Sequence, residues 1–109
     1  MIKAGQIAEI LALYKKHGWT TRRVLLSDAL RANLAGSLET LFGAAEIRSS
    51  EIDAVWFSRQ SKPEQETFEL RRLSETPLAL MEIFDVEDED EVREETLAEV
   101  EERLKTFQR

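Results

Sequence analysis

Cysteine is absent from this chain of 109 residues, and histidine and tyrosine occur once each. Without cysteine the protein forms no disulfide and offers no thiol nucleophile or thiolate metal ligand, which fits a reducing, cytoplasmic setting. The first five residues do not match a secretory signal peptide. No apolar run approaches the roughly 20 residues that span a bilayer, so we expect no membrane association.

Few residues suit catalysis or metal binding. His17 is the one imidazole that could activate a serine, and no acidic residue near it in the sequence suggests a third triad member. A zinc site would need several carboxylates, which is unusual for that metal. The acidic run that starts at Asp85 has Asp90 and Thr96 where a calcium-binding EF-hand loop requires glycine and glutamate. The sequence therefore predicts neither a metal nor another cofactor.

The formal net charge of −7 is concentrated in one segment. Between Asp85 and Glu102 the only basic residue is Arg93, whereas the rest of the chain is slightly basic. The overall negative charge disfavours non-specific binding to nucleic acid or membranes. We expect the acidic segment to be a solvated helix start or a surface that meets a basic partner.

A chain of this length is expected to form one domain, residues 1–109. Apolar residues three or four positions apart predict a helix over residues 3–16, which Gly18 ends. The residues that share this apolar face are Ile7, Ile10, Leu11 and Tyr14. A similar apolar stripe predicts a second helix over residues 89–107.

Three short strands are predicted in succession, over residues 53–59, 67–73 and 78–85. The two prolines, Pro63 and Pro77, lie in the gaps between them. Short connections of this kind predict an antiparallel meander.

The segment after the first helix is open to two interpretations. Residues 22–27 form a short apolar run after a glycine turn, which favours a strand. The alternative is a helix over residues 20–33, which would form a helix-turn-helix DNA-binding motif with the first helix. Beyond it, residues 28–43 predict one or two short helices. Residues 45–48 predict the beginning of a strand that leads, with a kink at Ser49 and Ser50, into the first meander strand.

These elements predict an α+β fold in the order α-β-(short α)-β-β-β-α. A mainly antiparallel sheet of three to five strands is flanked by the N- and C-terminal helices, both of which we expect on one face. The meander strands are apolar on two faces, so the second face also needs a cover. We favour residues 28–42 over a second copy of the protein, because burial then stays within one domain.

One group of residues resembles a catalytic arrangement. Asp53 opens the first meander strand, Glu69 and Arg71 share a face of the next, and the first helix carries Glu9. This outline is similar to the divalent-metal nucleases of the PD-(D/E)xK type, over residues 52–73 and the preceding helix. The resemblance implies that Asp53 and Glu69 hold magnesium.

Two positions depart from the motif of that family. Arg71 stands where the family has lysine, and no proline precedes Asp53. Arginine stays protonated near neutral pH, so Arg71 would stabilise phosphate charge rather than act as a base. The competing interpretation is that Glu69 and Arg71 each form an ion pair with a residue of a neighbouring strand.

The sequence favours a small non-enzymatic interaction or accessory module, whose partner is another protein or a second copy. The predicted interaction surface comprises Trp19, Trp56, Arg59, Arg71, Glu87 and Asp90. Aromatic residues among arginines also suit base stacking, but we expect the aromatics in the core and therefore no nucleic-acid partner. The alternative function is a divalent-metal-dependent, nuclease-like enzyme that uses Asp53, Glu69 and Arg71.

Overall fold

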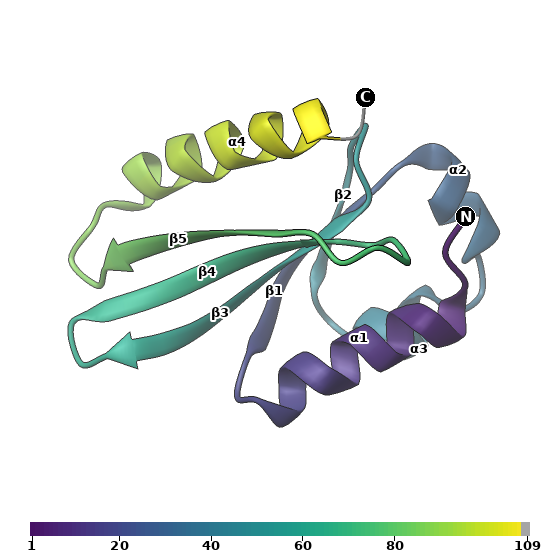
Figure 1. Ribbon diagram of the computed structural model, residues 1–109, viewed down its shortest axis with the longest axis horizontal. Helices are drawn as coiled ribbons and strands as arrows, with labels where there is room; N and C mark the ends of the chain where they lie inside the picture. Colours follow the sequence, from purple (N-terminus) through teal and green to yellow (C-terminus); the bar gives the residue numbers. More distant parts are fainter. Residues whose placement is uncertain (108–109) are drawn as a thin grey trace.

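The computed structural model describes residues 1–107, which form a five-stranded sheet with helices on both faces (Figure 1). The helices are α1 (Ala4–Lys16), α2 (Asp28–Asn33), α3 (Leu38–Phe42) and α4 (Asp90–Phe107). The strands are β1 (Thr20–Leu26), β2 (Glu46–Ser49), β3 (Ala54–Lys62), β4 (Gln65–Arg72) and β5 (Ala79–Asp85). They lie in the order β2-β1-β3-β4-β5. The predicted α+β class is confirmed, and the order of elements matches apart from one strand: β2 does not continue into β3 but pairs parallel with β1 at the edge of the sheet.

The strand that the sequence favours over residues 22–27 is confirmed as β1, which begins earlier, at Thr20, and ends at Leu26, because Ser27 caps α2. β1 pairs antiparallel with β3 and parallel with β2, and α2 and α3 form the connection between the two parallel strands. Val24, Leu25 and Leu26 are all buried, because β1 lies inside the sheet and both of its faces are covered. The alternative helix over residues 20–33, and the helix-turn-helix motif with it, is wrong.

The predicted meander is confirmed in β3, β4 and β5. Phe57 of β3 lies opposite Glu69 of β4, which in turn lies opposite Met81 of β5. Successive side chains of a strand point to opposite faces of the sheet. Around these positions, odd-numbered residues therefore face the side of α1, and even-numbered residues face the side of α4.

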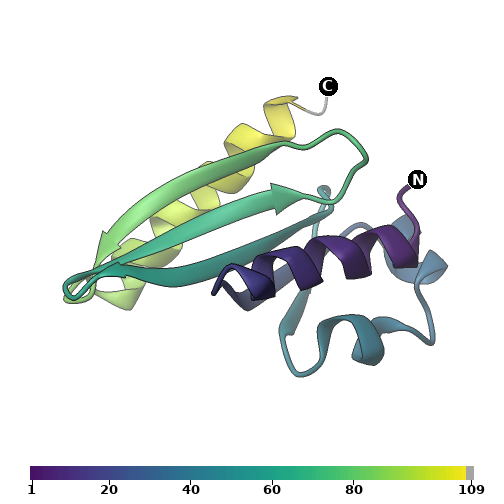
Figure 2. The ribbon, with the colours of Figure 1, turned by 60° about the horizontal axis from the view of Figure 1, so that its bottom comes forward.

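Each face of the sheet has its own hydrophobic core. The core on the α1 side joins that helix, α2 and α3 to the sheet through Ile7, Leu30, Leu34, Phe42, Val24, Leu26, Val55 and Phe57. The core on the α4 side joins the last helix to the sheet through Leu97, Val100, Leu104, Leu25, Trp56, Phe68, Leu70 and Phe84. In Figure 2, α1 lies in front of the sheet and α4 behind it. The expectation that both terminal helices pack on one face is wrong.

The chain itself covers the second face, but with α4 rather than with residues 28–42. The connection from β1 to β2 carries α2 and α3 to the α1 side, where they share the core of that helix. The opposite face displays Trp56, Phe68 and Phe84, which need a long cover. Helices of 6 and 5 residues are too short for this, whereas α4 has 18.

The cover on the α1 side is incomplete. α1 packs over β1 and β3, and the half of the sheet formed by β4 and β5 stays open (Figure 2). On this open half, Met81 and Ile83 of β5 are 56% and 59% exposed, and Leu13 of the facing helix is 55% exposed. The meander therefore keeps an apolar surface in solvent.

Crossing a bilayer would require a longer or more apolar helix than any found within residues 1–107.

Candidate functional site

A groove lies between the C-terminal half of α1 and the open half of the sheet. Its volume is about 470 Å³. We call it the α1-side groove; its lining residues are Leu13, Tyr14, His17, Trp19, Arg59, Glu69, Arg71 and Pro77. A second hollow of about 450 Å³ shares Leu13 and Arg71 and continues along the same helix past Ile10. The hollowed surface thus follows most of α1.

Aromatic stacking fixes one wall of the groove. The Tyr14 ring stacks on Phe57, with centroids 3.9 Å apart and an interplanar angle of 10°. Trp19 meets the Tyr14 ring edge-on at 5.9 Å. Phe57 is fully buried in β3, so this wall is anchored in the core. The edge-on contact between Trp19 and Tyr14 is of the kind that adds packing energy beyond the buried area.

Arg59 closes the end of the groove. Its guanidinium carbon lies 4.6 Å from the Trp19 ring centroid, a cation–π arrangement. Its Nη1 donates a hydrogen bond of 3.0 Å to the carbonyl oxygen of His17, at the C-terminal end of α1. A positive charge at this end of a helix is favourable. Arg59 thereby fixes both the helix end and the indole that lines the groove.

The polar floor of the groove is formed by Tyr14, Glu69 and Arg71. Burial raises the pKa of the Tyr14 hydroxyl above its ordinary value, the neighbouring Glu69 carboxylate raises it further, and Arg71 opposes this rise. The phenol is therefore protonated and neutral across the physiological pH range. It serves as a hydrogen-bond donor beside the Glu69 carboxylate.

The raised pKa of Tyr14 predicts a loss of stability in alkali. Above about pH 10 the tyrosine of the unfolded chain ionises while Tyr14 in the folded protein stays protonated, so the free energy of unfolding falls as pH rises. Tyr14→Phe should reduce this dependence of the free energy of unfolding on pH, as measured by urea denaturation at several pH values. Because the chain has a single tyrosine, tyrosinate absorbance follows the group directly. A folded-state titration midpoint at the ordinary value would contradict the prediction.

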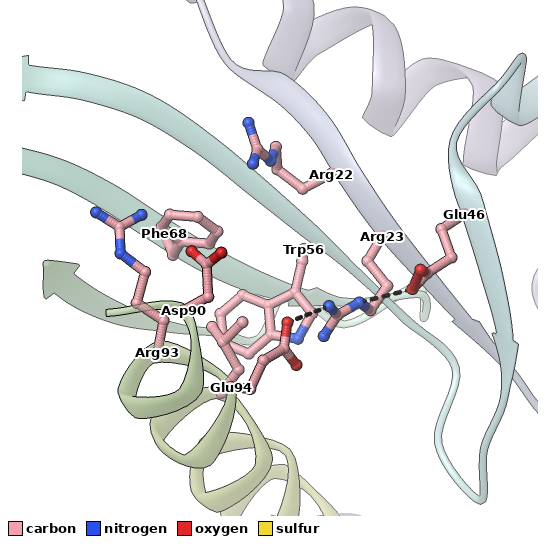
Figure 3. Close-up of a pocket in the computed structure, with 9 residues that line it drawn as sticks. Arg22, Arg23, Glu46, Trp56, Phe68, Asp90, Arg93 and Glu94 are labelled. Atoms are coloured by element: carbon pink, nitrogen blue, oxygen red, sulfur yellow. Dashed lines mark hydrogen bonds and ion pairs between the residues drawn. The ribbon is translucent and has the colours of Figure 1, made fainter. Parts of the chain in front are cut away.

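A smaller hollow of about 240 Å³ lies on the other face, between α4 and the sheet (Figure 3). Figure 3 shows Arg23 of β1 between two carboxylates. Its Nε lies 3.0 Å from Oε1 of Glu46, and its Nη2 lies 2.6 Å from Oε1 of Glu94. The hydrogen bond from Arg23 lowers the pKa of Glu94. These ion pairs connect α4 to β1 and β2, so we assign this hollow a structural role.

The predicted interaction residues divide between the two faces. Trp19, Arg59 and Arg71 come together in the α1-side groove. Trp56 and Asp90 line the hollow under α4, and Trp56 is only 1% exposed. Glu87 is exposed in the turn that precedes α4. Of the aromatic residues that could stack on bases, Trp56 and Phe57 are buried, as we expected for core residues.

The structure does not bring Asp53 together with Glu69. Asp53 precedes β3, and its carbonyl oxygen accepts a hydrogen bond from the amide of Leu73. Glu69 of β4 lies opposite Phe57, four residues beyond Asp53, which corresponds to roughly 13 Å along the strand. Within residues 1–107, no group of three or more histidine, cysteine, aspartate or glutamate side chains is placed to hold a metal ion.

The Asp53 carboxylate instead contacts the start of α2. Oδ1 accepts a hydrogen bond of 2.7 Å from the Ser27 amide, and Oδ2 accepts one of 3.1 Å from the Ser27 hydroxyl. The same hydroxyl oxygen accepts from the Leu30 amide at 3.2 Å and so caps α2. Asp53 therefore holds the N-terminal cap of a helix.

Sequence reasoning missed Leu13 and Tyr14 as groove residues. The helical spacing places Tyr14 on the apolar face of the first helix, and Leu13 lies beside that face. The sequence does contain an indication for Leu13: a leucine outside the apolar stripe of a helix does not face the core, so it is expected to be exposed. Met81 and Ile83 also alternate with β-strand period, which indicates a second apolar surface.

No protein-family model, curated protein or solved structure matches the chain. The function of the α1-side groove is therefore inferred from its residues and geometry alone.

Proposed function

We propose that this protein is a small interaction module that binds a segment of a partner protein in the α1-side groove. The observation that supports this most directly is the exposure of three large apolar side chains: Met81 and Ile83 on the open half of the sheet, and Leu13 on α1. Grouped apolar residues beside a hollow mark interaction sites more often than scattered ones do. The absence of cysteine fits a cytoplasmic setting for this role.

The charges of the groove favour an acidic partner segment. Arg59 and Arg71 outnumber the single carboxylate of Glu69 among the lining residues, although the protein as a whole carries a net charge of −7. Neither arginine forms an ion pair with an acidic side chain in the part of the chain that the structure describes. We therefore infer a partner segment that combines apolar side chains with a carboxylate.

The phenol of Tyr14 and the guanidinium groups of Arg59 and Arg71 suit recognition. The Tyr14 phenol is held in its protonated form, and guanidinium groups stay protonated near neutral pH. These groups bind carboxylates and stack on planar groups, and they exchange no proton in the physiological range. The nuclease-like alternative remains a separate prediction, which the substitution Asp53→Ala tests.

Leu13→Asp should abolish capture of the partner from a cell lysate by the immobilised protein. The variant places a carboxylate in a groove that we expect to receive apolar and acidic groups. Val92→Asp is the matched control, because Val92 is 50% exposed and lies on α4, across the sheet. We expect a loss of at least about tenfold in the amount of bound partner for Leu13→Asp and none for the control.

Charge reversal at Arg71 distinguishes recognition of an acidic segment from non-specific apolar binding. Arg71→Glu leaves the apolar residues in place and should lose the same partner. Retention of that partner by both groove variants, or its equal loss with Val92→Asp, would contradict the proposal. Circular dichroism of each variant verifies that the fold is intact.

A further inference from the structure

The two edges of the sheet differ sharply. β2 has four residues, and its charged side chains Glu46 and Arg48 form an ion pair. Short, charged edges of this kind discourage pairing with another strand. β5 has seven residues, and Glu82 is the only charge between Ala79 and Phe84. A long apolar edge without lysine or proline is a template for a further strand.

The hydrogen bonds of the meander show which groups of this edge point outward. The Arg72 amide donates to the carbonyl oxygen of Leu78, and the Val86 amide donates to that of Glu64. In an antiparallel ladder, alternate residues direct both backbone groups to the same neighbour. Even-numbered residues of β5 therefore bond to β4, and Ala79, Met81 and Ile83 direct their N–H and C=O groups outward.

We infer that β5 pairs antiparallel with β5 of a second copy, about a two-fold axis at Met81. In this register Met81 lies opposite Met81 of the partner subunit, and Ala79 lies opposite Ile83 of the partner subunit. The three hydrogen-bonded pairs of residues would exchange about six backbone hydrogen bonds. The two sheets would join into one continuous sheet with no exposed apolar edge at β5.

Neighbouring registers are less favourable for identifiable reasons. A two-fold axis at Glu82 would place two carboxylates directly opposite each other, which is destabilising. An axis at Leu80 would pair Ile83 with Pro77, which has no N–H to donate. The register centred on Met81 instead places Glu82 opposite an apolar leucine.

Charge at the strand ends favours the antiparallel direction. The C-terminal end of β5 carries Asp85 and is followed by Glu87 and Glu89, and these carboxylates outnumber the Arg93 guanidinium that contacts the Asp85 carbonyl oxygen. At its N-terminal end, Arg71 and Arg72 of β4 lie beside Ala79 and Leu78. Antiparallel pairing brings the acidic end of each copy to the basic end of the other, whereas parallel pairing would bring like charges together. This complementarity identifies a second copy as the occupant of the edge.

The dimer would also place the two α1-side grooves on the same face. A two-fold axis perpendicular to the sheet leaves the α1 side of both copies on the same side of the joined sheet. The two grooves would then lie on either side of a floor formed by Ala79, Met81 and Ile83 of both copies. The functional meaning of this placement rests on the proposed function. The pairing at β5 does not, because it does not require that the grooves bind a partner.

Cross-linking with cysteine tests the register, since the natural chain has no cysteine. Opposed residues of a hydrogen-bonded pair have Cα atoms about 5.5 Å apart, within the range of roughly 4.4–6.8 Å that a disulfide spans. Met81→Cys should therefore form a covalent dimer rapidly under mild oxidation. Ile83→Cys is the control: it is equally exposed, yet the two copies of residue 83 would lie roughly 13 Å apart.

We expect Met81→Cys to cross-link at least about tenfold faster than Ile83→Cys, and the wild-type protein to sediment as a dimer at micromolar to millimolar concentration. Equal rates for the two variants, faster cross-linking of Ile83→Cys, or a wild-type monomer at every concentration would overturn the inference. Leu13→Asp separates the two proposals, because it should prevent partner binding in the groove and leave the Met81→Cys cross-link unchanged.

Discussion

Trp56→Ala is expected to lower the free energy of unfolding by about 4 kcal/mol, because the substitution removes a large buried ring from a packed core. The side chain is 1% exposed in the core on the α4 side. Its indole N–H donates a hydrogen bond of 2.8 Å to Oε2 of Glu101, and its ring meets Phe68 edge-on. Alanine would leave a cavity and remove the link between β3 and α4.

Trp19→Ala is the matched control for this substitution. Trp19 is only partly buried, at the end of the α1-side groove, so its loss should cost less than half as much. Urea denaturation followed by circular dichroism measures both variants without depending on tryptophan fluorescence. Equal losses for the two variants, or a smaller loss for Trp56→Ala, would contradict the assignment of Trp56 to the core.

Asp53→Ala is expected to lower the free energy of unfolding by about 2–3 kcal/mol, because hydrogen bonds to a charged group contribute more than neutral ones. The substitution removes both acceptors of Ser27, and the hydroxyl that caps α2 loses its support. Because Ser27→Ala disrupts the same network, the double variant should be less destabilised than the sum of the single variants. Urea denaturation of the three variants measures this coupling.

The same variant tests the nuclease-like alternative. If Asp53 held magnesium for catalysis, Asp53→Ala would abolish a magnesium-dependent cleavage of nucleic acid and leave the stability unchanged. If Asp53 is the anchor of α2, the stability falls and the double variant shows the coupling with Ser27. Unchanged stability together with a lost cleavage activity would therefore contradict the structural role.

The order of elements was predictable because its signals are local. The residues of α1 repeat with helical spacing, and Gly18 ends that helix with a positive φ of 85°. The meander follows from short apolar segments separated by proline-containing turns. The parallel partner of β1 was harder to predict. This partner, β2, has only four residues and is joined to β1 by a connection that contains two helices.

The assignment of helices to faces was not a local property. The alternation in β3 and β5 indicates two apolar faces, but it does not indicate which helix covers which face. That choice depends on the connection from β1 to β2 and on the turn from β5 into α4. The size of Trp56, Phe68 and Phe84 shows that the long helix must cover them, but only once it is known that the three side chains lie on the same face.

The candidate sites show the same limit. Glu69 and Arg71 alternate along β4 and share a face, as the sequence predicts, but a metal site also requires that Asp53 lie close to Glu69. The register places Glu69 opposite Phe57 and so separates it from Asp53. The α1-side groove combines residues from Leu13 to Pro77, and only the tertiary structure brings them together.

Amide hydrogen exchange along β5, measured by NMR at several protein concentrations, tests most directly whether the β5 edge of the sheet is a contact surface. The amides of Leu80 and Glu82 bond to β4, so we expect slow exchange for both at every concentration. The outward amides of Met81 and Ile83 should exchange fast in dilute protein and become protected as the concentration rises. Fast exchange of these two amides at every concentration would contradict pairing at β5.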